Sequence, residues 1–187
     1  MNNIINQISH WELLDIEKPA RYLGGEANQA KIKTNPKLRV CLVFPDLYEL
    51  GMSNQAIKIF YESINNREDI MAERCFAPWP DFEALLRKKG LPLYSLETGT
   101  ALNQFDAIYI TLPYEMTFTN VLYILDLGGI PLLWKDRKDG PVVIAGGPSA
   151  ANPMPVSKFM DAIFIGDGEE SILEMCDKLI TTKEANS

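Results

Sequence analysis

The sequence has little histidine and little cysteine. Its single histidine is His10, and its three cysteines are Cys41, Cys75 and Cys176. The cysteines lie within apolar stretches, and their spacing matches neither a zinc site nor a disulfide framework. We therefore expect buried free thiols, and we expect His10 to be exposed to solvent.

Long apolar runs and an excess of positive charge are also missing. The longest uncharged apolar runs, such as AIYITLP and PVVIAGGP, are much shorter than the roughly 20 residues that span a bilayer. The N-terminus lacks the basic start, apolar block and cleavage site of a secretory signal, so we expect a cytoplasmic protein without a membrane partner. The formal net charge of −7 disfavours direct nucleic-acid binding, which relies on clustered Lys and Arg.

What the sequence does have is enough apolar residues for one sizeable core. It contains 187 residues, of which 47% are hydrophobic. Short runs rich in Val, Ile and aromatic residues indicate strands that are covered on both faces. These runs are residues 38–44, 105–112, 141–145 and 161–166, with a weaker candidate at 71–77.

Helical periodicity separates these runs. Apolar residues recur at i, i+3, i+4 and i+7 within residues 57–64 and 118–125. In DFEALLRKKG, Asp81 is expected to cap the start of a helix and Gly90 to end it. The last helix is expected to start near Glu169, because acidic residues suit the positive end of the helix dipole.

The alternation of strands and helices predicts an α/β fold. We expect a flavodoxin-like, doubly wound parallel sheet with strand order 2-1-3-4-5, spanning residues 38–182. Ligands of such sheets bind beyond the carboxyl ends of the strands, where the strand order reverses. Residues 1–37 are expected to form an N-terminal arm that is ordered only if another surface fixes it.

The loop after the first expected strand, FPDLYELGMSN, contains the pattern Asp-x-Tyr-x-x-Gly. It resembles the Asp-x-His-x-x-Gly loop of cobalamin-binding domains of this fold, in which the imidazole binds cobalt and the Asp orients it. Those domains also carry Ser or Thr after the third strand and Gly-Gly after the fourth. The resemblance implies a cofactor-binding set made of Asp46, Tyr48, Gly51, Thr111, Gly146 and Gly147, together with Gly166 and Gly168 of the GDGEE turn.

Tyr48 stands at the histidine position of that loop. A phenol with a pKa of about 10 is neutral in neutral solution and is a poor replacement for imidazole. The resemblance therefore implies that any bound cobalamin has no histidine ligand. The lower face of cobalt would be open, held by water, or shielded by Tyr48.

A broader resemblance covers residues 18–182. The segment VVIAGGPSAANP, followed by FMDAIFIGDGEESI, resembles the end of the cobalamin-binding-like domain that precedes the catalytic barrel in many radical S-adenosylmethionine (radical SAM) proteins. The GDGEE turn differs by one residue from the GEGE-type turn found at this place in those proteins. With RYLGGEANQ and ERCFAPWPDFE, the chain resembles the N-terminal part of a family of uncharacterised radical SAM proteins.

This resemblance implies that an iron–sulfur cluster and S-adenosylmethionine are bound by a barrel, to which residues 183–187 would lead. The Cys-x-x-x-Cys-x-x-Cys loop that holds such a cluster is absent from this sequence. We therefore expect that the chain is not catalytic alone and that the full-length protein is a radical SAM enzyme. The expected partner is the barrel, and the oligomeric state stays open.

Two other interpretations remain open. The domain could have kept the fold and lost the cofactor, so that its crevice docks the barrel or a protein partner, and the missing histidine favours this view. A signalling receiver is disfavoured, because it needs paired acids after the first strand, an acidic acceptor after the third and a Lys after the fifth. A dinucleotide-binding domain is disfavoured, because the first strand is not followed by GxGxxG. Asp46 could also simply cap a turn, and the glycines could serve tight turns.

Other loop residues also have two interpretations. Trp79 and residues 113–116 are expected on the same rim, where exposed aromatic residues suit either a domain interface or a corrin face. The acids Asp167, Glu169 and Glu170 are consistent with charge at a helix N-terminus or with contact to the barrel.

Overall fold

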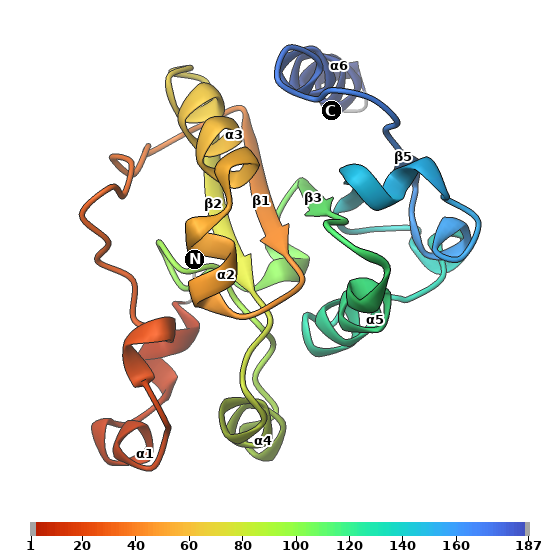
Figure 1. Ribbon diagram of the computed structural model, residues 1–187. Coiled ribbons are helices and arrows are strands. Elements are labelled where there is room, and N and C mark those ends of the chain that lie inside the picture. The colour runs from red at the N-terminus through yellow and green to blue at the C-terminus, as the bar shows by residue number, and fades with distance from the viewer. Residues whose placement is uncertain (1–2, 186–187) are drawn as a thin grey trace.

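The computed structural model describes residues 3–185, and their centre is a five-stranded parallel sheet (Figure 1). The strand order is β2-β1-β3-β4-β5, and every neighbouring pair is parallel. The predicted flavodoxin-like α/β fold and its strand order are therefore confirmed. The strands are β1 (Leu38–Phe44), β2 (Ile70–Phe76), β3 (Ala107–Thr111), β4 (Val142–Gly146) and β5 (Ala162–Ile163).

The ends of two strands differ from the prediction. The weak candidate at 71–77 is the full-length edge strand β2. In contrast, β5 is much shorter than the predicted 161–166. Its paired register with β4 ends at Ile163, and the chain then passes through Gly166, whose φ of 135° favours glycine.

The helices cover both faces of the sheet, which explains the apolar strands. In Figure 1, α3 and α6 lie on one face, and α4 and α5 lie on the other. Buried strand residues alternate accordingly, with Leu42 packed on the α3 and α6 side and Val43 on the α4 and α5 side. The helices are α1 (His10–Leu14), α2 (Tyr48–Ser53), α3 (Gln55–Asn65), α4 (Pro80–Lys89), α5 (Phe118–Leu127) and α6 (Ser171–Ala185).

The predicted N-cap of α4 is wrong. The capping position belongs to Trp79, and Pro80 takes the first helical position, where its fixed φ and missing N–H are tolerated. The carboxylate of Asp81 instead accepts hydrogen bonds from the backbone N–H groups of Phe82 and Glu17, both at 2.7 Å. Gly90 ends the helix in the left-handed conformation with a φ of 64°, as predicted.

The last helix begins at Ser171, two positions after the predicted start near Glu169. It continues through Ala185, so residues 183–185 of the expected tail are helical. The remaining tail residues, 186 and 187, lie outside the described part of the chain, as do arm residues 1 and 2.

The N-terminal arm is ordered from residue 3, and the surface that fixes it is its own domain. Ile8 is buried in the core on the α4 side of the sheet. The ring of Tyr22 stacks on Phe82 with the ring centroids 3.8 Å apart. Glu12 pairs with Lys89 of α4 at 2.9 Å, and this hydrogen bond, with those from Ser9, lowers the pKa of Glu12 to about 2. The arm therefore belongs to the folded unit.

The edge strand β2 carries charged residues that are buried. Glu73 is fully buried and pairs with Arg39 of β1. Arg74 is 2% exposed, and its Nε donates to Glu97 Oε1 at 2.6 Å. The Arg74 carbonyl also accepts from the backbone N–H of Leu96 at 2.7 Å. The segment after α4 thus covers the open edge of β2, which protects it from pairing with another chain.

The cysteine prediction is confirmed, because Cys41, Cys75 and Cys176 are free and buried. Burial raises the pKa of the Cys41 thiol well above its usual value. Among the described residues, none of the helices has the length and apolar character needed to cross a membrane.

Candidate functional site

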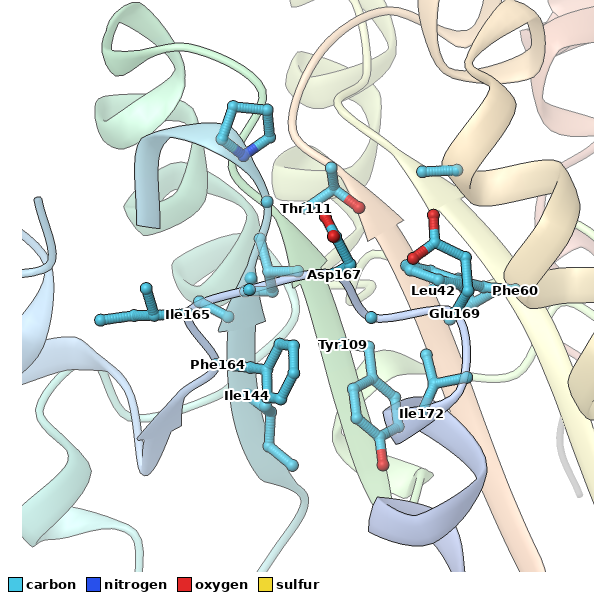
Figure 2. Close-up of a pocket in the computed structure, with 18 of the residues that line it drawn as sticks. Leu42, Phe60, Tyr109, Thr111, Ile144, Phe164, Ile165, Asp167, Glu169 and Ile172 are labelled. Atoms are coloured by element: carbon cyan, nitrogen blue, oxygen red, sulfur yellow. The ribbon is translucent and has the colours of Figure 1, made fainter. Parts of the chain in front are cut away.

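A cavity of about 620 Å³ opens at the carboxyl ends of β3 and β4 and continues along the sheet between α3 and α6 (Figure 2). It lies where ligands bind in this class of fold, and its volume falls within the usual range for small-molecule sites. Its lining is Leu42, Asn54, Ala56, Phe60, Tyr109, Ile110, Thr111, Pro113, Ile144, Ala145, Gly146, Gly147, Pro148, Ala151, Phe164, Ile165, Gly166, Asp167, Gly168, Glu169, Ile172 and Met175.

The pleat of the strands decides which side chains face the cavity. Thr111 and Gly146 are directly paired across β3 and β4. Two residues earlier on the same strands, Tyr109 and Ile144 face the same side and are also paired. The missing side chain at Gly146 therefore leaves room at the mouth of the cavity.

Three further glycines shape the loops at the mouth. Gly147 has a φ of 107°, and a Cβ there would lie 3.1 Å from the Leu112 carbonyl oxygen. Gly166 has a φ of 135°, which also favours glycine. A Cβ at Gly168 would lie 3.0 Å from the ring of Phe60. The glycines thus let the two loops close over the strand ends.

The inner part of the cavity is apolar except for one phenol. Tyr109 is 6% exposed, and its hydroxyl is 3.8 Å from Sγ of Cys176 on α6. Figure 2 shows the Tyr109 ring between Ile144 and Ile172, with the hydroxyl directed toward α6. Burial raises the pKa of Tyr109, and it raises the pKa of Cys176 to about 11. Both groups are therefore neutral near pH 7.

The mouth of the cavity is acidic. Asp167 and Glu169 lie on the loop that crosses the strand ends, and Figure 2 shows the Asp167 carboxylate near Thr111 and the Glu169 carboxylate near Phe60. The lining contains no Lys, Arg or His. The site therefore has hydrogen-bond acceptors at its mouth and no cation to hold an anion there.

Five of the eight predicted site residues line this cavity, and three do not. Those at the cavity are Thr111, Gly146, Gly147, Gly166 and Gly168, whereas Asp46, Tyr48 and Gly51 of the first loop are absent from its lining.

Both carboxylate oxygens of Asp46 accept hydrogen bonds from other groups of the domain. One carboxylate oxygen accepts from the backbone N–H of Leu47 at 2.7 Å, and the other accepts from the hydroxyl of Tyr114. This hydrogen bond raises the pKa of Tyr114 to about 12. The hydrogen bond from Tyr114 to Asp46 connects the loop after β3 to the loop after β1. Asp46 therefore holds these two neighbouring loops together.

Tyr48 and Gly51 face the side of the arm. The Tyr48 ring packs edge-on against Phe76, with the centroids 5.6 Å apart. Burial, followed by a hydrogen bond with Glu26, raises the pKa of Tyr48 to about 12. A Cβ at Gly51 would lie 2.2 Å from the Phe76 ring, so this glycine permits α2 to pack closely on β2. Both residues serve packing in this structure.

The rim beside the cavity exposes apolar side chains, as expected for Trp79 and the segment after β3. Trp79 is 41% exposed, Tyr114 38% and Met116 85%. Such residues suit contact with another domain.

Sequence reasoning missed the inner wall of the cavity, formed by Tyr109 of β3, Phe60 of α3 and Met175 of α6. Counting back two residues from Thr111 would have indicated Tyr109, because alternate residues of a strand face the same side. No comparable signal identifies Phe60 or Met175. Their part in the wall depends on how α3 and α6 sit on the sheet.

Comparison with known families connects this geometry to a class of proteins. Residues 56–187 match the model described as the N-terminal region of radical SAM proteins. The chain belongs to this radical SAM N-terminal family. All of the lining residues except Leu42 and Asn54 lie within the matched region.

The radical SAM N-terminal domain also has a curated relative. An uncharacterized protein of Methanocaldococcus jannaschii is 26% identical over 136 residues, which are 71% of this chain and 24% of the relative. The chain therefore spans about a quarter of the length of this relative. Within residues 3–185 of the radical SAM N-terminal domain, no three His, Cys, Asp or Glu side chains gather in a way that could hold a metal ion.

Proposed function

We propose that this module of a radical SAM protein binds cobalamin, with the nucleotide tail of the cofactor in the cavity and with no protein side chain on cobalt. The observation that supports this proposal best is the cavity itself. It starts at the ends of β3 and β4 and continues between α3 and α6, which gives an elongated ligand both a mouth and an apolar interior.

The apolar lining of the cavity fits the flat base of such a tail, whereas the phosphate of the tail would find the Thr111 hydroxyl and no basic side chain among the lining residues. Small residues, including Gly146 and Ala56, leave space along the walls, and the apolar surfaces of Phe60 and Ile172 suit the flat base at the end of the tail. The Thr111 hydroxyl at the end of β3 is placed to hydrogen-bond the tail at the mouth. These groups bind and orient the cofactor.

Neither Tyr48 nor His10 is placed to reach cobalt in a cofactor that occupies this cavity. Tyr48 packs against Phe76, away from the cavity lining. His10 begins α1, which Figure 1 shows on the side of α4, opposite to α3 and α6. If cobalamin binds here, the lower face of its cobalt would be open or held by water. When bound, cobalamin supplies a cobalt centre that can carry a methyl group.

The whole protein's activity follows as part of the same proposal. The curated relative is much longer than this chain, and the family model describes an N-terminal region. In our proposal the domain presents cobalamin to a radical SAM barrel of the same protein. That barrel holds the iron–sulfur cluster and S-adenosylmethionine, and this domain is not catalytic alone.

The second candidate function is a cofactor-free docking domain. It is favoured by the first loop, where Asp46 is engaged by Tyr114 and Tyr48 by Phe76. Because these side chains already have partners within the domain, the loop needs no ligand to order it. The exposed Trp79 and Met116 on the same rim would then contact the barrel or a protein partner.

Titration of the purified chain with hydroxocobalamin, followed by visible absorption, separates the two candidates. We expect saturable binding in the micromolar range and the same bound spectrum for the wild type and Tyr48→Phe, because the phenol lies away from the cavity. A spectrum that changes in Tyr48→Phe would mean that Tyr48 reaches cobalt. Absence of binding at high micromolar cofactor would favour the docking domain.

A further inference from the structure

We infer that the interior of the cavity selects corrinoids by the base at the end of the nucleotide tail. It accepts an apolar base such as dimethylbenzimidazole and rejects bases that carry hydroxyl or amino groups. The side chains of Phe60, Ile172 and Met175 are central to this selection. The inference rests on the proposed function and adds to it the chemical class of the base.

With one exception, the polar side chains of the lining lie at the mouth of the cavity. Thr111 ends β3, and Asn54 caps the start of α3, where its Oδ1 accepts from the backbone N–H of Ile57 at 3.1 Å. Asp167 and Glu169 belong to the loop between β5 and α6. A group that passes the mouth leaves these hydrogen-bonding partners behind.

Below the mouth, the wall is apolar on both the sheet side and the helix side. Leu42 of β1 and Ile144 of β4 lie on the sheet side, and Phe60 of α3 with Ile172 and Met175 of α6 lie on the helix side. Aliphatic and aromatic side chains offer no hydrogen bond, and the thioether of methionine is only a weak acceptor. Leu42 and Ile144 are each paired with a strand on either side, so the sheet uses their backbone groups.

The exception is the hydroxyl of Tyr109, and it does not face the space that a base would fill. Figure 2 shows this hydroxyl directed toward α6, where Sγ of Cys176 lies 3.8 Å away. A polar group on a base in the interior would therefore leave water without gaining a side-chain partner from the lining.

The selection follows from the cost of burying a polar group. A hydroxyl or amino group that loses water and gains no hydrogen bond weakens binding by about tenfold or more. Methyl groups gain free energy when apolar walls cover them. Dimethylbenzimidazole carries methyl groups at the edge of its ring, whereas hydroxybenzimidazole carries a hydroxyl there and adenine carries an amino group. The apolar interior therefore favours cobalamin over corrinoids with these polar bases.

The test compares hydroxocobalamin with hydroxybenzimidazolyl cobamide in its hydroxo form, which has a hydroxyl on the base in place of the methyl groups. Both bases are benzimidazoles that bind cobalt through the same ring nitrogen, so the cost of releasing the base is similar in the two corrinoids. Dissociation constants would be measured by visible absorption. We expect the wild type to bind hydroxocobalamin at least about tenfold more tightly. In Met175→Gln, whose amide can hydrogen-bond the hydroxyl, we expect this preference to fall to about threefold or less.

The matched control is Leu179→Gln. It places the same amide on the same helix, at a residue that is also partly buried but does not line the cavity. We expect this variant to keep the wild-type preference. Equal affinity of the wild type for the two corrinoids, or an unchanged preference in Met175→Gln, would overturn the inference. Failure of the wild type to bind either corrinoid would instead overturn the proposed function.

Discussion

Replacing Glu97 with alanine is expected to lower the free energy of unfolding by about 3–5 kcal/mol, the usual cost of leaving one charge of a buried pair alone. Glu97 Oε1 accepts from Arg74 Nε at 2.6 Å, and Oε2 accepts from the Arg74 backbone N–H at 2.7 Å. The side chains of Glu97 and Arg74 are 0% and 2% exposed. The substitution therefore removes a double contact that water cannot replace.

The surroundings of Arg74 make the loss large. Its guanidinium lies 4.1 Å from the centre of the Tyr61 ring, and its Nη1 donates to Asn28 Oδ1 at 3.3 Å. Its Nη2 is already buried without a partner. Burial raises the pKa of Glu97, and Arg74 opposes this shift. Burying this ion pair thus costs desolvation free energy. In the variant, Arg74 would still be desolvated but would lack the attraction of Glu97 that offsets the cost.

Urea unfolding followed by circular dichroism measures this effect. The control is Glu83→Ala, which breaks a partly exposed pair with Arg87 on α4 and is expected to cost less than about 1 kcal/mol. The double variant Glu97→Leu/Arg74→Met removes both charges and is expected to recover much of the lost stability. A loss below about 1 kcal/mol in Glu97→Ala would contradict the role given to this pair.

The substitution Gly146→Leu is expected to weaken hydroxocobalamin binding by at least about 30-fold, because overfilling a packed site costs roughly 1–3 kcal/mol or more. Gly146 ends β4 beside Thr111 and faces the same side as Ile144. A leucine there would occupy the mouth of the cavity. Visible titration of the wild type and the variant measures the change.

This variant is expected to fold. The nearest neighbour of a Cβ at Gly146 would be the Phe164 carbonyl oxygen at 3.6 Å, and the φ of Gly146 lies outside the left-handed region. Ala162→Leu on the neighbouring strand is the matched control, because Ala162 is exposed and does not line the cavity. Wild-type affinity in Gly146→Leu, with circular dichroism unchanged, would place the cofactor elsewhere.

Much of the fold could be predicted from the sequence, because local periodicity and strand alternation specify this sheet. The strand β2 gave the weakest signal, since IMAERCF places Glu73 and Arg74 at its centre. Their partners include Glu97, more than 20 residues away in the sequence. Periodicity cannot show that a distant carboxylate will neutralise a buried arginine.

The site could be predicted only in part. Thr111 and Gly146 reach the cavity because they end adjacent parallel strands, which the topology dictates. Tyr48 does not reach it, because α2 packs Gly51 tightly onto Phe76 and turns toward the arm. The direction of a short helix after a strand depends on such tertiary contacts. The spacing of residues in a motif does not reveal these tertiary contacts.

The most direct test of the central claim is electron paramagnetic resonance of cob(II)alamin bound to the chain. If the nucleotide tail lies in the cavity and no protein side chain replaces it, neither the tail nor a histidine supplies a nitrogen to cobalt. We therefore predict a bound spectrum without nitrogen splitting on the cobalt lines. A bound spectrum that shows nitrogen splitting would contradict the account.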